Sequence, residues 1–179
     1  MTHAVLIQNQ VAAKDISAYN RSVVSGSDAV DNGNVFWLQA QGSSGSASEV
    51  WTVVTPATGS LIGLWMAASP EVPITVDGAL VYKGLNSDPR NFYNVGGTPF
   101  DAFKPVAGDV ITLTADALDS ATAAAFAGAT NGSGKLTWAA TIAANAFTLR
   151  YLATTYISIG SGAIDNQRVT AFKFEVLNN

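Results

Sequence analysis

The chain has 179 residues, a formal net charge of −4 and a pI of about 4.7; 48% of its residues are hydrophobic and only 12% are charged. This length suits one domain of roughly 100–200 residues. No cluster of lysine or arginine is present to bind phosphates, which argues against a nucleic-acid partner. The absence of cysteine excludes disulfides and thiolate metal sites.

The low charge predicts protein–protein contacts. An average globular protein has about 25% charged residues, so a chain with 12% is expected to cover part of its exterior with other subunits. The start, MTHAVLIQNQ, lacks the pattern of a secretory signal, and no run approaches the roughly 18 apolar residues of a membrane span. We therefore expect synthesis in the cytoplasm, no membrane partner and self-association.

Residues 1–33 are expected to form an extended N-terminal arm. They show neither sustained strand alternation nor a long helical stripe. In such an arm Val5 and Ile7 would contact a partner and become ordered on binding. His3, the single histidine, would be too mobile for a catalytic triad or a metal site.

Residues 34–179 are expected to form a β-rich domain. VFWLQAQ (35–41) and EVWTVVT (49–55) have the composition of two hairpin strands. The apolar segment 61–70 fits a strand or a short helix, and we favour the strand. In 74–84, Asp77-Gly78 is a dipeptide typical of a type I′ hairpin turn.

The segment Ser87–Pro105 is expected to be a long, ordered, irregular loop, because it contains three prolines and a Gly-Gly pair. Aromatic side chains restricted in this way suit an interface. The predicted interface residues of this loop are Phe92, Tyr93, Phe100 and Phe103.

The rest of the chain contains further strand patterns. A strand begins at Val110, and the alanine-rich stretch 115–127 fits one short helix. Three more strand-like segments follow, and in the last of them Phe172, Phe174 and Val176 alternate with charged residues, as in a strand with one buried face. The fold class is therefore all-β, a β-sandwich or barrel-like domain.

No motif points to catalysis, a cofactor or a metal. Five aspartates adjoin turn residues, where a carboxylate caps backbone N–H groups: Asp28, Asp31, Asp77, Asp88 and Asp109. Asp101 and Asp109 are a candidate pair for acid–base chemistry. GATNGSGK lacks the Walker A spacing. The four tryptophans fit core packing, and a sugar-stacking platform is the alternative interpretation.

The chain from about Ala12 to Asn179 resembles a family of small tailed-bacteriophage virion proteins found beside the major capsid protein. The resemblance lies in DNGNV, EVW, LWM, SPEV, the DPR and AFKP block and a C-terminal RVTAFKFEV segment. The positions that carry it are Asp31–Val35, Glu49–Trp51, Tyr82–Gly84, Asp88–Arg90, Phe103–Pro105 and Ile164–Val176.

The resemblance implies a head decoration, or cement, protein that binds the outer surface of the capsid and stabilises the shell. Its partners would be the major capsid protein and copies of itself, as a symmetric oligomer for which we expect a trimer. It implies no catalytic residue, and it places the protein in the virion. Two alternatives remain open: a tail-tube or head–tail component, and a carbohydrate-binding β-sandwich module.

Overall fold

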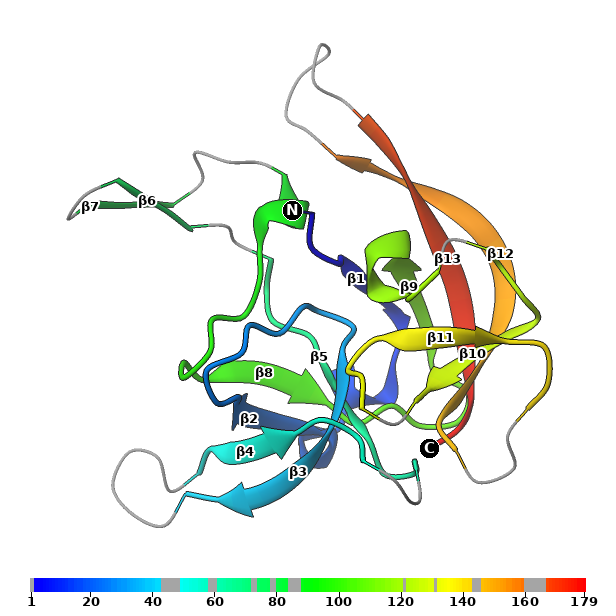
Figure 1. The fold of residues 1–179 in the computed structure, drawn as a ribbon, viewed down its shortest axis with the longest axis horizontal. Helices are drawn as coiled ribbons and strands as arrows, with labels where there is room; N and C mark the ends of the chain where they lie inside the picture. The colour runs from blue at the N-terminus through cyan, green and yellow to red at the C-terminus, as the bar shows by residue number, and fades with distance from the viewer. Residues whose placement is uncertain are drawn as a thin grey trace.

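The protein is all-β, as the sequence predicts (Figure 1). The computed structural model describes residues 2–42, 49–57, 61–71, 74–77, 80–83, 88–120, 122–130, 132–142, 146–159 and 167–179. In these residues a six-stranded sheet lies beside a small closed barrel, and a separate hairpin pairs β6 (Ile74–Asp77) with β7 (Leu80–Lys83). The predicted Asp77-Gly78 turn includes a residue outside the described part of the chain.

The six-stranded sheet is antiparallel throughout and has the order β1-β9-β13-β12-β10-β11. Its two longest strands, β12 and β13, form a hairpin that rises above the rest of the sheet in Figure 1. The strands of this sheet are β1 (Leu6–Gln10), β9 (Val110–Thr114), β10 (Phe126–Ala129), β11 (Leu136–Ala139), β12 (Thr148–Ile159) and β13 (Gln167–Asn178).

The barrel closes in the order β2-β4-β3-β5-β8, and only its β2–β4 pair is parallel. Its β3–β4 pair is the hairpin predicted from VFWLQAQ and EVWTVVT, and β5 confirms the strand favoured for 61–70. The strands are β2 (Asn20–Val24), β3 (Val35–Gln41), β4 (Trp51–Val54), β5 (Trp65–Ala67) and β8 (Phe100–Phe103). Single 3₁₀ turns occur at η1 (Ala12–Lys14), η2 (Ser17–Tyr19), η4 (Pro89–Asn91) and η5 (Ala115–Ala117).

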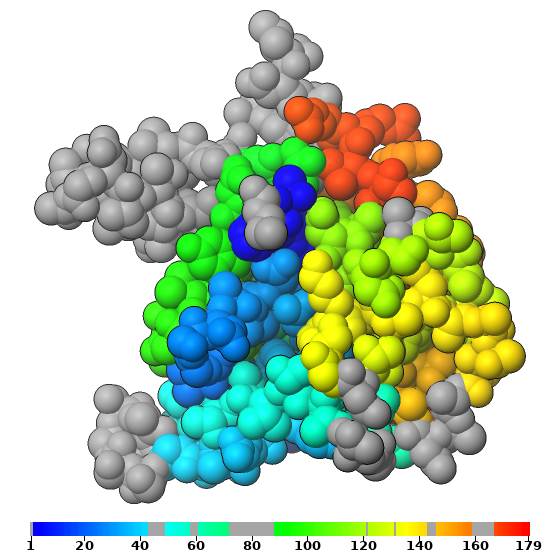
Figure 2. Space-filling model, viewed as in Figure 1, coloured from blue at the N-terminus to red at the C-terminus, as the bar shows by residue number. Residues whose placement is uncertain are grey.

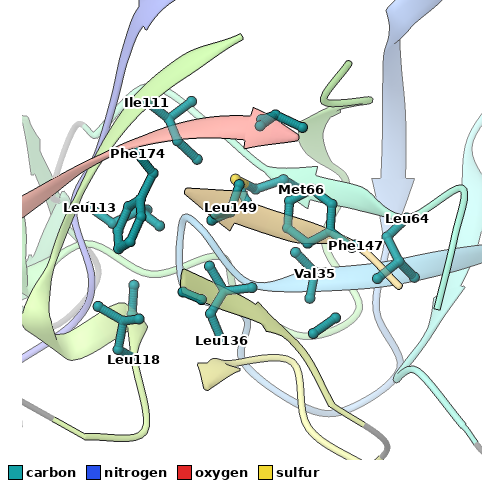
Figure 3. Packing of buried hydrophobic residues seen from close by; sticks show 14 of the residues in the cluster. Val35, Leu64, Met66, Ile111, Leu113, Leu118, Leu136, Phe147, Leu149 and Phe174 are labelled. Carbon is teal, nitrogen blue, oxygen red and sulfur yellow. The ribbon is translucent and has the colours of Figure 1, made fainter. Parts of the chain in front are cut away.

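The main hydrophobic core joins the sheet to the barrel (Figure 3). Phe174 and Leu149 come from the sheet, whereas Met66 and Phe103 come from the barrel, and all four side chains are fully buried. A second cluster belongs to the barrel alone and includes Phe36, Trp65 and Phe100. Neighbouring residues of β5 and β8 therefore contribute to different clusters, as expected for the alternating side chains of a strand.

The expectation of a separate N-terminal arm is wrong for the described residues of 1–33. Residues Leu6–Gln10 pair with β9, and Asn20–Val24 pair with β8 and β4. Ala4 and Val5 are buried in the chain's own interior. The sequence pattern was weak because β1 is an edge strand whose mostly polar side chains leave little alternation to detect.

Two smaller expectations also need correction. Among the described residues of 115–127, the chain forms the turn η5 and the start of β10. Ala127 packs in the core, and a Cβ on the next residue, Gly128, would come within 2.8 Å of the Phe147 carbonyl oxygen. Tertiary packing overrides alanine's helix propensity here. Within Ser87–Pro105, the last part is not irregular, because β8 closes the barrel.

Candidate interaction surface

His3, near the start of the described chain, is held by three contacts at one end of the molecule. His3 donates its backbone N–H to the Arg90 carbonyl at 2.8 Å, and its imidazole Nδ1 lies 2.7 Å from Asp31 Oδ1. The ring also packs against Tyr93, with centroids 4.8 Å apart. In Figure 2 the dark blue residues near the N-terminus lie between the green and yellow-green segments of the surface. The prediction that His3 is mobile is therefore wrong.

Next to His3, Arg90 connects the η4 turn to the start of β13, at the outer end of the β12–β13 hairpin. Its guanidinium forms a two-pronged ion pair with Asp88, and its Nη2 also donates to Gln167 Oε1 at 3.0 Å. The side-chain hydrogen bond from Arg90 holds the pKa of Asp88 below its ordinary value. Asp88 also caps η4 by accepting the Arg90 N–H, which confirms the capping role predicted for this aspartate.

Behind this end, a buried polar cluster ties β1 to the barrel. The Asn32 side chain exchanges two hydrogen bonds with the backbone of Ser69, and its amide also donates to Glu71 Oε1. Glu71 in turn accepts the Leu6 N–H at 3.0 Å. Burial raises the pKa of Glu71 above its ordinary value, although these two hydrogen bonds act in the opposite direction.

Three of the six predicted interface residues are buried in the protein's own interior. Val5 is buried, Phe103 belongs to the main core, and Phe100 belongs to the barrel cluster. These three side chains stabilise the domain and offer no surface to a partner. The sequence could not separate them from exposed residues, because hydrophobic anchors of a core and of an interface have the same composition.

The other three predicted residues reach the surface. Phe92 is half-buried, whereas Ile7 on β1 and Tyr93 after η4 are exposed. Tyr93 lies at the end of the molecule formed by His3 and Arg90, and Val95, two residues further on, is 53% exposed. The surviving part of the prediction is therefore a small apolar surface around Tyr93.

The feature that the sequence reading missed is the outer half of the β12–β13 hairpin. Beyond the irregularity between Tyr151 and Ala153, the two strands pair regularly up to Ile159 and Gln167. Tyr156 is 53% exposed on this ribbon, and the Arg168 guanidinium lies 4.5 Å from its ring centroid. The strand alternation of the C-terminal segments was recognised, but alternation alone does not reveal where a hairpin extends past its sheet.

The two aspartates of the candidate acid–base pair have different surroundings. Asp109 is buried and accepts N–H groups from Ala12 and Val106 at 2.9 Å, which confirms its predicted capping role, whereas Asp101 is exposed on β8. Among the described residues, no Ser or Thr hydroxyl bonds to the His3 ring, and no group of three His, Cys, Asp or Glu could hold a metal ion. No helix in the described ranges is long and apolar enough to cross a membrane.

The tryptophans pack as predicted. Trp138 contacts Tyr151, Phe172 and Phe174 in an aromatic group at the edge of the main core, and Trp65 is buried in the barrel cluster. The other two, Trp37 and Trp51, are partly buried against the two clusters.

Two neighbouring grooves, of about 430 and 400 Å³, run beside β1. Gln8, Ala68 and Pro70 line both, and neither groove contains a tryptophan. These grooves therefore lack the aromatic platform that a carbohydrate-binding module needs.

No protein family matches the chain, and no curated protein or solved structure is significantly similar to it.

Proposed function

We propose that this protein is a structural component of a tailed-bacteriophage virion, a decoration protein that binds the outside of the head shell and stabilises it. The observation that carries the proposal is the combination of a packed β core with an unusually low content of charged residues. Only 12% of the residues are charged, and large apolar side chains such as Tyr93, Val95 and Tyr156 are exposed. An exterior of this kind favours close contact with many neighbouring subunits.

Several positions that carry the family resemblance hold loops in place within this fold. Asp31 and Asn32 of DNGNV hold the N-terminus and the buried polar cluster, and Gly33 adopts a φ of 88° where a Cβ would meet Leu113. Asp88 and Arg90 of DPR form the ion pair at the same end of the molecule. These residues keep the loops in place, and the attachment surface is expected to be the exposed apolar residues beside them.

The test of this function is co-sedimentation of the purified protein with undecorated capsids. We expect the wild-type chain to bind, and Tyr93→Asp to weaken binding at least tenfold because it puts a charge into the apolar surface. Ile16→Asp is the matched control, because Ile16 is similarly exposed on a different part of the chain. Equal binding by both variants would remove Tyr93 from the attachment surface. A wild-type protein that fails to bind capsids would contradict the decoration role itself.

Mass spectrometry of purified particles is the complementary measurement. A decoration protein is expected in many copies per particle, because a symmetric shell repeats its binding site, whereas a tail or head–tail component would occur in far fewer. Absence from purified particles would refute the virion assignment. The trimer expected from the resemblance stays a prediction.

A further inference from the structure

The six-stranded sheet has two outer strands, and both are covered by other parts of the chain. On β1, Glu71 accepts the Leu6 N–H and the Lys14 ammonium donates to the Gln8 carbonyl. On β11, the neighbouring segment supplies an isolated bridge from Leu118 to Leu136 and a hydrogen bond from the Asp119 N–H. Charged groups, irregularities and short strands of this kind prevent edge-to-edge association.

In the part of the chain that the structure describes, the outer half of β12 has none of these protections. Its pairing with β10 ends at Arg150, and among the described residues only β13 pairs with Ala153–Ile159. This segment, ATTYISI, contains no charged residue, proline or glycine. It is rich in β-branched residues, which favour extended pairing. A long, regular and uncharged strand edge is a template for adding another strand.

We infer that this edge binds the same edge of a second copy of the chain, as an antiparallel pair about a two-fold axis at Tyr156. In an antiparallel ladder, opposite residues lie on the same face, so a two-fold axis perpendicular to the sheet must pass through a residue position. The free segment Ala153–Ile159 is centred on Tyr156. Pairing about that residue uses the whole segment and stops before the part of β12 that β10 occupies.

The side chains of this register are compatible with each other. Tyr156 lies opposite Tyr156 of the second copy, and Thr155 lies opposite Ile157. Cross-strand aromatic and β-branched pairs of this kind stabilise sheets. The Arg168 guanidinium packs over the Tyr156 ring of its own chain and lies diagonal to the two-fold axis. The paired segments themselves contain no charged residue, so no like charges face each other across the axis. The four strands β13-β12-β12-β13 then form one continuous sheet.

A second copy is favoured over a strand of another protein because the edge is self-complementary in hydrogen bonding and in charge. This inference deepens the self-association part of the proposed function, with a two-fold dimer in place of the expected trimer, and in that respect rests on it. It is tested with the purified chain alone. Its failure is therefore distinguishable from failure of capsid binding, which the co-sedimentation assay measures.

The first experiment is sedimentation of the full chain over a range from about 1 to 200 µM. We expect a monomer–dimer equilibrium that Tyr156→Lys weakens about tenfold or more, because two lysines would face each other at the axis. Val95→Lys is the matched control, since Val95 is as exposed as Tyr156 but lies outside the ribbon. Melting curves check that both variants fold. A monomeric wild type, or a Tyr156→Lys variant that dimerises as the wild type does, overturns the inference.

The second experiment uses the absence of native cysteine to test the register. Under mild oxidation, Tyr156→Cys should form a covalent dimer many-fold faster than Val95→Cys. Thr155→Cys and Ile157→Cys should cross-link with each other when mixed, and only slowly when each is alone. Equal rates at Tyr156 and Val95 contradict the pairing. Protection of the ribbon amides from hydrogen exchange only on capsids, with a monomer in solution, assigns the edge to a capsid strand and also overturns it.

Discussion

The Nδ1 atom of His3 lies 2.7 Å from Oδ1 of Asp31, and this contact joins the first described residues to the turn that precedes β3. Asp31 Oδ2 also accepts the N–H of Ala4, whose side chain is buried. The start of the chain is thus part of the folded domain, so its removal is expected to destabilise that domain.

Deletion of residues 1–10 is expected to destabilise the isolated domain strongly. It removes the buried Val5 side chain, worth about 1.5–3 kcal/mol, and the β1–β9 hydrogen bonds, each worth about 0.5–1.5 kcal/mol net. A loss of about 3 kcal/mol or more is a large part of the typical stability of a domain. Urea unfolding measures it. Ile7→Ala is the control, because Ile7 is exposed, and an unchanged midpoint for the deletion would show that β1 is dispensable.

Phe103→Ala and Tyr93→Ala should separate core residues from surface residues. Phe103 is fully buried between sheet and barrel, so its truncation is expected to cost about 3–5 kcal/mol. Tyr93 is exposed, and its truncation should cost less than about 1 kcal/mol while affecting capsid binding. Thermal unfolding compares the two. Similar losses of stability would contradict the burial described for these aromatic residues.

Glu71 should make stability depend on pH. Since burial raises its folded-state pKa, the folded protein keeps this proton at pH values where the unfolded chain, near the ordinary value of 4.5, has lost it. The stabilising contribution of the Glu71 proton to folding is complete at pH values below 4.5 and is lost as the pH rises through the folded-state pKa. Glu71→Gln keeps an acceptor for Leu6 and removes the charge. It should therefore unfold at higher urea than the wild type at pH 7 and at about the same urea at pH 4. A constant difference across this range would exclude the titration of Glu71 as its cause.

Gly96 marks a close approach between two loops. A Cβ built on it would lie 2.4 Å from the backbone of Ser27, whereas one on Gly26 would meet nothing within 4 Å. Gly96→Ala is expected to cost about 1–3 kcal/mol through overpacking, and Gly26→Ala to stay within about 0.5 kcal/mol of the wild type. Chemical denaturation of the pair tests this close approach. A neutral Gly96→Ala would show that the loops can separate.

The sequence predicted the fold class and those strands that carry a clear local signal. The β3–β4 and β6–β7 hairpins and the alternation of Phe172, Phe174 and Val176 were all readable from local composition and period. Each of these features depends on neighbours along the chain, which a single sequence displays directly.

The remaining features depend on contacts between distant residues. The strand β8 has four residues and exists because it closes the barrel between β2 and β5, which no local pattern reports. For the same reason, the sequence grouped Phe100 and Phe103 with Tyr93, although only Tyr93 is exposed. The ribbon edge was missed because its exposure depends on where β10 stops pairing with β12.

The position of β9 constrains the order in which the molecule can assemble. Leu113 of β9 lies opposite Leu6 on one side and opposite Phe172 on the other, so this strand receives its two neighbours from opposite ends of the chain. During synthesis, β1 therefore stays without a partner in its sheet until β9 has been made, and β9 gains its second neighbour only when β13 follows. Pairing over such long sequence separations slows folding.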